Sequence, residues 1–467
     1  MADTPVHNHI AGTDRPAASG ATTELTGPVT GRVHGRAPRS GPADVDAACA
    51  AAAAAYAYWS TTTPAERQRA LLGIADAVEE HAEAFTDAET ADTGKPRHQF
   101  RTEELPAITD TLRFFAGAAR NLPGPAAAEY TEGRTSLLRR EPVGVCAQIT
   151  PWNYPLMMAV WKLAPALAAG NTTVLKPADT TPSSTALLAR VAAAHLPPGV
   201  LNVVCGDRDT GRALTAHPDV ALVAVTGSVR AGREVAAAAA AGLKRVHLEL
   251  GGNAPVIVHD DADPETTAAA LAPVAYYNAG QDCTAPTRFL VHHRVHDAFL
   301  AALAAHAAEL RPGTDYGPLN NPAQLAAVRG FLERLPDHAA IVTGGARLPG
   351  PGLFHEPTVV ANVRQDDEIV QEEVFGPVVT VQSFTDEEEA LRLAGGVRHG
   401  LAASVWTTAH DRAMRATRSL RTGIVWVNTH GTTVSEMPHG GTGQSGYGSD
   451  LSMAGLLEYT RVKHVML

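Results

Sequence analysis

The stretch VGVCAQITPWNYPLMMAVWKLAPALAAGNTTVLK, residues 143–176, decides the fold. Residues 143–149 are apolar and strand-like, residues 156–169 place apolar side chains at helical spacing, and residues 172–176 form a second strand pattern. A strand, a helix and a second strand in succession form a βαβ unit, in which the two strands lie parallel. This stretch therefore predicts a parallel sheet with helices packed against it.

The same alternation continues toward the C-terminus. We expect helices at 183–194, 231–241 and 296–308, and strands at 200–204, 221–225, 256–258, 289–291, 341–343 and 378–383. Upstream, residues 45–88 and 104–119 have helical patterns, and residues 135–138 are strand-like. Because strands alternate with helices in two series, we predict an α/β fold of two doubly wound domains, joined near residues 249–255.

The composition fits a globular protein with sizeable cores. The chain has 467 residues, 45% of them hydrophobic and 19% charged, which is enough for two or three domains. A formal net charge of −11 argues against a nucleic-acid partner, which needs a basic surface. Residues 1–10 lack the apolar run of a signal peptide, and no apolar stretch approaches the ~20 residues of a membrane span. We expect no membrane partner and a cytoplasmic location, with disorder confined to roughly the first thirty residues.

One of the four cysteines stands out. Cys49, Cys146, Cys205 and Cys283 form no C-x-x-C pair, so neither a disulfide framework nor a metal site is expected. An isolated cysteine is usually a small buried apolar residue. Cys283, however, lies among glycine and small polar residues in NAGQDCTAPTR, residues 278–288. This composition predicts an accessible loop at the start of a helix, where the helix dipole would lower the pKa of the thiol. Cys283 is therefore a candidate nucleophile.

Two further segments could serve a thiolate that attacks an aldehyde. The oxyanion that forms needs hydrogen-bond donors, and the amide of Asn153 in PWNYP, residues 151–155, could supply one. Glu249 in LELGGN, residues 248–253, is flanked by leucines, so burial would make its carboxylate a candidate general base. Each has a structural alternative: a turn residue between prolines, and a surface glutamate before an interdomain turn.

Candidate cofactor residues follow the predicted strands, although the chain has no G-x-G-x-x-G motif at a strand–helix junction. The segment VTGS, residues 225–228, ends one strand and opens a helix, where free N–H groups could bind a pyrophosphate. Lys176 follows another strand, and its ammonium could bond a ribose hydroxyl with help from Asp179. The alternatives are a helix cap and a solvated lysine.

Taken in order, these motifs resemble the aldehyde dehydrogenase superfamily from about residue 45 to the C-terminus. The matching segments are EPVG (141–144), PWN (151–153), KP (176–177), TGS (226–228), ELGG (249–252), GQDC (280–283) and EVFGP (373–377). The resemblance implies that Cys283 is the nucleophile, Asn153 the oxyanion donor and Glu249 the general base. It also implies that Lys162 supports the base. The thiohemiacetal would lose hydride to the nicotinamide, and Glu249 would activate water to hydrolyse the thioester.

The resemblance also implies a coenzyme and an assembly. NAD is the expected coenzyme, and NADP stays open because Asp179 is shorter than the family's glutamate. Lys176 and Glu373 would bind the two riboses and Phe375 would pack near the nicotinamide; the other candidates are Ile149, Thr150, Trp152, Gly206, Gly227 and Ser228. The NAD(P)-binding domain would comprise residues 1–120 and 141–249, and the catalytic domain residues 250–445. A small β oligomerisation element, with a hairpin starting near Gly124, would comprise residues 121–140 and 446–467 of a homodimer or homotetramer.

Five segments resemble γ-aminobutyraldehyde dehydrogenases: FFAGAAR (114–120), GQDCTA (280–285), VSEMPHGG (434–441), SGYG (445–448) and YTRVKHVM (459–466). This implies an ω-aminoaldehyde substrate such as 4-aminobutanal, whose ammonium would meet Glu104, Asp110 and Trp161. Gly431 stands where that subgroup has a bulky residue beside the aldehyde tunnel. The alternatives are a betaine-aldehyde or semialdehyde dehydrogenase, a CoA-acylating enzyme and a non-catalytic relative.

Overall fold

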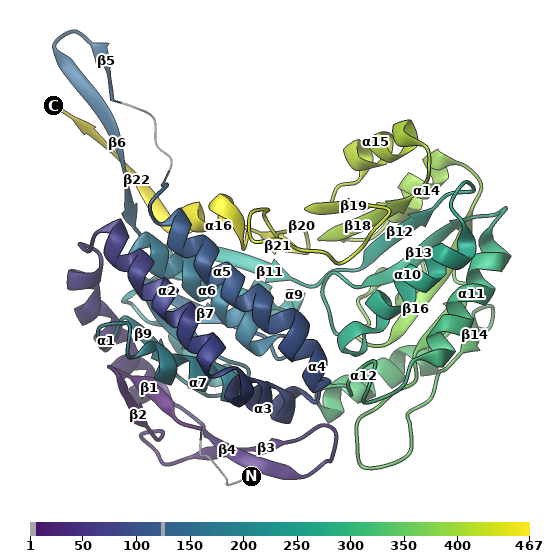
Figure 1. Cartoon of the computed structure of the whole chain (residues 1–467), viewed down its shortest axis with the longest axis horizontal. Coiled ribbons are helices and arrows are strands. Elements are labelled where there is room, and N and C mark those ends of the chain that lie inside the picture. The colour runs from purple at the N-terminus through teal and green to yellow at the C-terminus, as the bar shows by residue number, and fades with distance from the viewer. Residues whose placement is uncertain (1–5, 123–126) are drawn as a thin grey trace.

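The computed structural model describes residues 6–122 and 127–467, and these residues form two lobes, each built on a mainly parallel sheet (Figure 1). The strand order of the first sheet is β2-β1-β9-β8-β7-β10-β11-β21. Its parallel strands are β7 (Val145–Ile149), β8 (Thr172–Lys176), β9 (Leu201–Val203), β10 (Val220–Gly227) and β11 (Arg245–Leu250). The chain runs outward from β7 to β9 and then returns to β10 on the other side, which makes the sheet doubly wound.

Helices cover both faces of this sheet. They are α1 (Pro42–Trp59), α2 (Pro64–Glu80), α3 (Ala82–Thr93), α4 (Arg97–Gln99), α5 (Leu105–Ala118), α6 (Pro155–Ala169), α7 (Ser183–Ala192), α8 (Arg208–Ala216) and α9 (Val229–Ala241). Adjacent residues of β7 point into different cores: Cys146 packs in the core of α5, α6 and α7, and Val145 in the core of α1. This alternation is why the strand is apolar along its whole length.

The second sheet has the order β14-β15-β16-β13-β12-β18-β19, and all its neighbours are parallel except β14 and β15. Its strands are β12 (Ala254–Val258), β13 (Pro286–His292), β14 (Ala340–Thr343), β15 (Thr358–Ala361), β16 (Val378–Phe384), β18 (Ala402–Trp406) and β19 (Ile424–Val427). Its helices are α10 (Pro264–Tyr276), α11 (His296–Glu309), α12 (Pro322–Glu333), α13 (Glu368–Gln371), α14 (Glu387–Ala394) and α15 (His410–Ser419). The predicted α/β class with two doubly wound sheets is confirmed.

A three-stranded arm projects from the first lobe (Figure 1). It consists of β5 (Ala128–Thr131), β6 (Arg134–Pro142) and β22 (Thr460–Met466), the last of which follows helix α16 (Ser452–Glu458). These strands fall in the segments predicted as an oligomerisation element; Gly124 lies outside the described residues. The division of the chain into three domains stays a prediction.

The expectation of disorder near the N-terminus is wrong for the described residues. β1 (Asn8–Ile10) is buried and pairs with β2 (Thr13–Arg15) and with β9. The Asn8 amide donates to Ser40 and accepts from the backbone N–H of Cys205, which ties this strand to the sheet. A hairpin of β3 (Thr22–Thr26) and β4 (Val33–Pro38) follows. Strands this short carry too few residues for a periodic signal.

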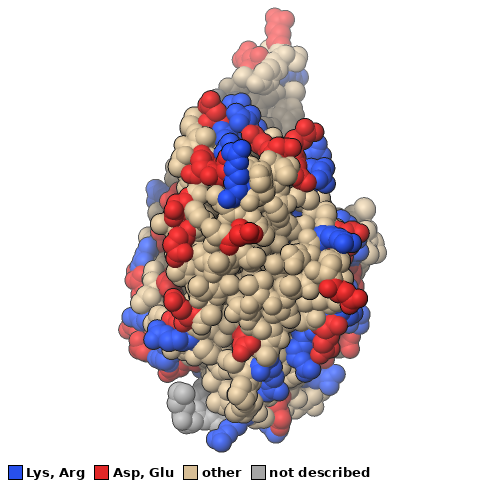
Figure 2. Space-filling model, turned by 90° about the vertical axis from the view of Figure 1, so that its right-hand side faces the viewer, with Lys and Arg blue, Asp and Glu red and all other residues tan. Residues whose placement is uncertain are grey.

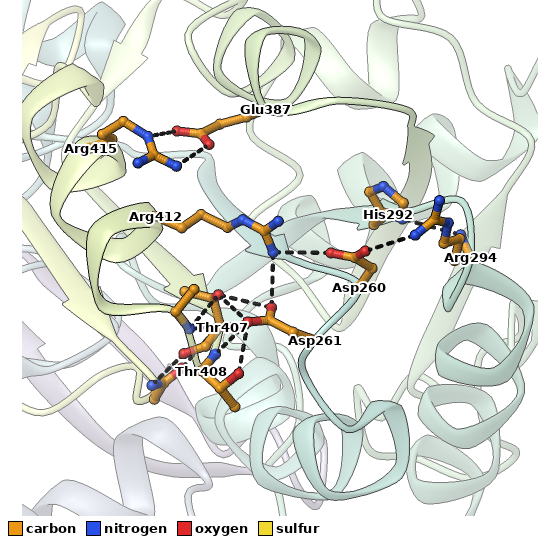
Figure 3. A network of polar contacts seen from close by, with 11 residues as sticks. Asp260, Asp261, His292, Arg294, Glu387, Thr407, Thr408, Arg412 and Arg415 are labelled. Atoms are coloured by element: carbon orange, nitrogen blue, oxygen red, sulfur yellow. Dashed lines mark hydrogen bonds and ion pairs between the residues drawn. The ribbon is translucent and has the colours of Figure 1, made fainter.

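A polar network fastens the end of β12 to the start of α15 (Figure 3). Asp261 accepts hydrogen bonds from Thr407, Thr408 and the backbone of Ala409, and it pairs with Arg412 at 3.1 Å. Burial works to raise the pKa of Asp261, but these donors lower it to about 2. The network fixes the edge of the second sheet that lies away from the cavity described below.

No helix of residues 6–122 and 127–467 is long and apolar enough to cross a membrane. Figure 2 shows the face that carries α11 and β14 in Figure 1: charges of both signs surround a mostly uncharged centre that holds isolated acidic side chains. That face has no continuous basic surface of the kind that nucleic-acid binding requires.

Candidate active site

A cavity of about 1240 Å³ collects residues from the ends of strands in both sheets. Residues 151–154 follow β7, residues 226–228 end β10 and begin α9, residues 249–251 end β11, and residues 282–285 precede β13. Cys283, Glu249 and Asn153 all line it. The fold thus brings together three side chains that are far apart in the sequence, at the carboxyl edge of the first sheet, where doubly wound sheets bind ligands, with Cys283 contributed from the turn that precedes β13.

Cys283 lies in a turn between a short 3-10 helix, η2 (Tyr277–Gly280), and strand β13. The prediction that it starts a helix is wrong, because the chain enters strand β13 directly after this turn. Burial raises the pKa of Cys283 well above its usual value, and the carboxylates of Asp282, Glu373 and Glu249 raise it further. The resting thiol is therefore protonated at neutral pH, and attack on an aldehyde needs a proton acceptor.

The backbone at Cys283 and Thr284 is closely packed. His430 contacts the Thr284 carbonyl oxygen through Nε2 at 2.7 Å and the Ser404 hydroxyl through Nδ1 at 2.9 Å. Burial lowers the pKa of His430 to about 4, so the ring is neutral, and a carbonyl only accepts; Nε2 therefore carries the hydrogen. A Cβ atom on Gly252 would lie 2.0 Å from the Cys283 carbonyl oxygen, so only glycine permits this close approach.

Asn153 fits the predicted oxyanion donor. It is buried in the turn between β7 and α6, and its Nδ2 donates to the Gln281 carbonyl at 3.0 Å. An amide nitrogen carries two hydrogens, so one N–H is left for an oxyanion in the cavity. The carbonyl of Asn153 accepts from the Lys95 ammonium at 3.1 Å and from the Asn278 amide at 2.9 Å, which fixes the orientation of this residue.

Glu249 lies on β11, and its side chain is 4% exposed. Its Oε2 is 3.3 Å from Nδ1 of His439, whose ring packs edge-on against Trp161. Burial alone would lower the pKa of His439, but the hydrogen bond and charge of Glu249 raise it. Lys162, predicted to support the base, is fully buried on α6 and donates to Asp450 at 2.9 Å instead. Lys162 does not line the cavity, whereas Asp450 does.

The predicted cofactor residues fall into two overlapping groups, and Gly227 and Ser228 belong to both. Ile149, Lys176 and Gly227 end β7, β8 and β10, and Gly206 follows β9, so all lie at the carboxyl edge of the first sheet. The Lys176 ammonium donates to the carbonyls of Pro177 and Gly206, and burial lowers its pKa. Thr150 donates its N–H to Lys176, Asp179 is exposed, and Ser228 caps α9 by accepting from the Ala231 N–H. The predicted strand-to-helix junction at residues 226–228 is confirmed.

The second group lines the cavity itself: Trp152, Gly227, Ser228, Glu373 and Phe375. Glu373 accepts the Gly252 N–H at 2.8 Å, and burial raises its pKa to about 8. Phe375 packs edge-on against Trp152 with ring centroids 5.4 Å apart. The open N-terminus of α9, the aromatic pair and the glycines together suit a flat ring joined to a ribose and a pyrophosphate.

Comparison with protein families matches residues 15–465 to the aldehyde dehydrogenase family. The chain belongs to this family. A betaine aldehyde dehydrogenase from Staphylococcus aureus in complex with NAD+ is 34% identical, with a TM-score of 0.96 over 99% of this chain and 94% of the other. Indole-3-acetaldehyde dehydrogenase from P. syringae, in complex with NAD+, is 35% identical, with a TM-score of 0.97 over 99% and 96%. A structure from Burkholderia cenocepacia, assigned as an aldehyde dehydrogenase, is 36% identical at a TM-score of 0.97 over 99% and 97%.

These findings make the protein an oxidoreductase of the aldehyde dehydrogenase family, and they leave its particular aldehyde open. The candidate substrate residues Glu104, Trp161 and Gly431 line the cavity. Asp110 does not: it accepts a hydrogen bond from Ser435 and lines a separate pocket at the surface. Residues 104 and 110 are six positions apart, which turns their side chains about 120° from one another on a helix. One helix face cannot present both to the same cavity.

Glu104 is already paired. Both of its carboxylate oxygens accept from the Lys95 ammonium at 2.8 Å, and both side chains are buried. Among the lining residues that were not predicted from the sequence are Tyr154, Tyr277, Asp282 and His439. Asp282 and Tyr154 adjoin the predicted nucleophile and oxyanion donor, so their position next to those motifs was a usable signal. His439 gave none, because it reaches Glu249 across 190 positions of the chain.

Proposed function

We propose that this aldehyde dehydrogenase oxidises an ω-aminoaldehyde, such as 4-aminobutanal, to the carboxylic acid, with Cys283 as nucleophile, Glu249 as general base and NAD as coenzyme. The protonated state of the Cys283 thiol supports a base at the outset, and Glu249 lines the same cavity. Asn153 would donate its remaining amide N–H to the oxyanion of the thiohemiacetal. Glu249 would then take a proton from the water that hydrolyses the thioester.

The coenzyme site is argued from residues of this chain. Lys176 and Glu373 would bind the riboses, the α9 N-terminus behind Ser228 the pyrophosphate, and Phe375 with Trp152 would pack near the nicotinamide. NAD supplies the acceptor for the hydride of the aldehyde carbon. The carboxylate of Glu373 packs closely against Gly251, which lies two residues after Glu249: a Cβ on Gly251 would lie 2.0 Å from a carboxylate oxygen of Glu373. Coenzyme and base are therefore supported by the same short segment.

The charge of the aldehyde side supports a cationic substrate. Glu104 is neutralised by Lys95 and Glu249 is paired with His439. Asp282, in contrast, accepts only from neutral groups: the Tyr154 hydroxyl at 2.7 Å, and the N–H and hydroxyl of Thr284. Its charge is free to attract an ammonium, and the aromatic faces of Tyr154, Trp161 and Tyr277 line the same cavity. This unneutralised carboxylate is the observation that carries the proposal.

The other aldehyde classes fit less well. A semialdehyde with a carboxylate tail needs a cation, but within the described residues the cavity lining has no lysine and only one arginine, Arg230, at the start of α9 on the coenzyme side. A CoA-acylating enzyme has no use for a base that activates water, and a non-catalytic relative has no use for the Cys283–Glu249–Asn153 constellation. Betaine aldehyde, whose quaternary ammonium is also cationic, is the second candidate.

A substrate panel tests the proposal. NADH formation would be followed with 4-aminobutanal, 3-aminopropanal, betaine aldehyde, succinic semialdehyde and hexanal, with NAD and NADP as acceptors. We expect the highest kcat/KM with 4-aminobutanal and NAD. Asp282→Asn should lower kcat/KM for the cationic aldehydes about tenfold relative to hexanal, because one charge contact of 1–2 kcal/mol is lost. Highest turnover with hexanal or succinic semialdehyde would reject the substrate class, and activity in Cys283→Ala would reject the nucleophile.

We also propose that the arm mediates a homodimer or homotetramer. Tyr130, Val462 and Met466 on the arm are 79%, 54% and 52% exposed, and the edge strand β19 of the second sheet exposes Val427. Exposed apolar residues on an edge favour pairing with another strand. Sedimentation of a variant that lacks residues 460–467 would report the assembly. The cytoplasmic location and the domain boundaries predicted from the sequence remain predictions.

A further inference from the structure

His247 lies between two buried carboxylates without a hydrogen bond to either. Its Nε2 is 3.6 Å from Oε1 of Glu249 and 3.7 Å from Oδ1 of Asp450. Within the described part of the chain, both ring nitrogens of His247 and both of these oxygens lack a hydrogen-bond partner, and all three residues are at most 3% exposed. A buried polar atom without a partner costs about 1–3 kcal/mol, so three such groups around one point require an explanation.

The fold builds this arrangement in two ways. His247 and Glu249 are two residues apart on β11, so their side chains leave the strand on the same face. Strand β21 (Gly446–Tyr447) pairs antiparallel with β11, and the chain beyond it places Asp450 opposite. A Cβ on Gly448 would lie 2.7 Å from the His247 ring, so this glycine leaves the space that the imidazole fills.

The carboxylate oxygens of Glu249 and Asp450 that do not face His247 already have partners. Asp450 accepts from the Lys162 ammonium at 2.9 Å through Oδ2, and Glu249 contacts His439 at 3.3 Å through Oε2. Each carboxylate thus has a basic partner on the side away from His247. The Lys162 ammonium would repel a divalent cation bound between His247, Glu249 and Asp450, so this arrangement disfavours a metal ion there. It suits instead the transfer of a single proton between these side chains.

We propose that His247 is a positioning residue that relays the proton from Glu249 to Asp450. The relay rests on the proposed role of Glu249 as the base. During hydrolysis, Glu249 accepts a proton from water as the water oxygen bonds to the thioester carbon, and the C–S bond breaks to release the Cys283 thiolate. Nε2 of neutral His247 takes this proton from Glu249 and hands it to Oδ1 of Asp450, while Nδ1 keeps its hydrogen. Glu249 is then ionised for the next turnover.

The geometry needs only a small adjustment. A shift of under about 1 Å brings Nε2 to hydrogen-bond distance from either oxygen. The remaining group that faces His247 is the ring of Tyr459, 6.3 Å away, and burial raises the pKa of that phenol well above its usual value. The two carboxylates are therefore the groups that exchange protons with His247. Asp450 lines the cavity, so its proton can pass to water when the product leaves.

The relay is tested by separating hydrolysis from the earlier steps. His247→Asn and His247→Gln would be compared with the wild type in rapid-mixing experiments, with hexanal and NAD in one series and 4-aminobutanal in another. The first-turnover rate of NADH formation reports thioester formation. The fraction of protein carrying an acyl mass on Cys283, measured by intact-mass spectrometry after quenching, reports hydrolysis. His259→Asn is the matched control, because His259 is also buried but follows β12 in the second sheet, away from the cavity that Glu249 and Asp450 line.

We expect both His247 variants to keep the first-turnover rate within about twofold and to lose about 10–100-fold in steady-state turnover. The acyl-enzyme should accumulate, and the steady-state rate should rise with pH as the solvent replaces the lost acceptor. His259→Asn should match the wild type. Normal hydrolysis and pH dependence in two folded His247 variants would overturn the relay, as would an equal loss in both steps. Glu249→Gln distinguishes the two proposals: normal hydrolysis in that variant would overturn the base itself.

Discussion

Replacing Lys95 with methionine should destabilise the protein strongly. The Lys95 ammonium contacts both oxygens of Glu104 at 2.8 Å and lies 3.9 Å from Glu89. All three side chains are at most 3% exposed. Methionine has a similar length and no charge, so the variant leaves two buried carboxylates without their cation. Removing one partner of a buried ion pair costs about 3–5 kcal/mol.

The loss should depend on pH. Burial already raises the pKa of Glu89 to about 7 from an ordinary value of 4.5, although Lys95 opposes this, and it raises the pKa of Glu104 as well. Without the ammonium both pKa values rise further. A carboxyl group whose pKa is higher in the folded state than in the unfolded state makes the protein less stable as the pH rises from the unfolded pKa through the folded pKa. The variant should therefore lose little stability relative to the wild type near pH 5 and most near pH 8.

Thermal unfolding at pH 5 and pH 8 measures both effects. At 2–4 °C per kcal/mol, the Tm at pH 8 should fall by roughly 6–20 °C. Adding Glu104→Gln to the variant should restore part of the loss, because one uncompensated carboxylate disappears. Arg113→Met is the matched control: Arg113 also contacts two carboxylates, but at the surface, where such pairs contribute about 0–1 kcal/mol. A Tm loss equal to that of the control, or equal at both pH values, would show that the Lys95 ammonium does not stabilise the protein by neutralising Glu104 and Glu89.

Three further outcomes are expected. Asn153→Ala should lower kcat about 100–1000-fold with little change in Tm, because an oxyanion donor is lost while the backbone contacts remain; a loss under tenfold in rapid-mixing assays would remove this role. Asp261→Asn should lower the free energy of unfolding by about 2 kcal/mol at pH 7, because the pKa of Asp261 is about 2 against an ordinary 3.8. The difference in Tm between the variant and the wild type should vanish as the pH falls from 4 toward 2. Gly431→Ala should lower the free energy of unfolding by about 1 kcal/mol, because φ is +84° and the new Cβ would lie 3.1 Å from Val274. The variant should also raise KM for bulky aldehydes. An unchanged KM would show that the aldehyde tunnel lies elsewhere.

The elements of the first lobe could be predicted because their patterns are local. The strand at residues 172–176 has the predicted bounds, and the helix at 156–169 differs by one residue. Long apolar periods and the Thr63–Glu66 capping box, with Pro64 at the first helical position, identify such elements without knowledge of the fold. The helix expected after Cys283 was wrong, although Pro286 gave a signal. A proline disfavours the helical conformation in the residue before it, and a strand begins there.

The site could be predicted only where the chemistry is carried by a motif. Cys283, Glu249 and Asn153 lie in distinctive segments, and the fold brings them into one cavity. The partners of these residues could not be found in this way. His439 contacts Glu249, and Asp450 contacts Lys162 across 288 positions, and neither pairing leaves a local trace. Such contacts depend on how the two sheets and the C-terminal segment pack.

The charges around the cavity explain why the nucleophile needs so much support. Lys95 pairs with Glu104 and Glu89, Lys162 with Asp450, and His439 with Glu249, whereas Asp282 is left without a basic partner. The same Asp282 that would attract an ammonium also raises the pKa of the adjacent Cys283 thiol. A carboxylate that would select for cations therefore makes the thiolate harder to form, so the thiol depends more on a general base that accepts its proton. An ammonium bound near Asp282 would offset part of that carboxylate's effect on the thiol, so under the proposed specificity a cationic substrate would also ease the activation of Cys283.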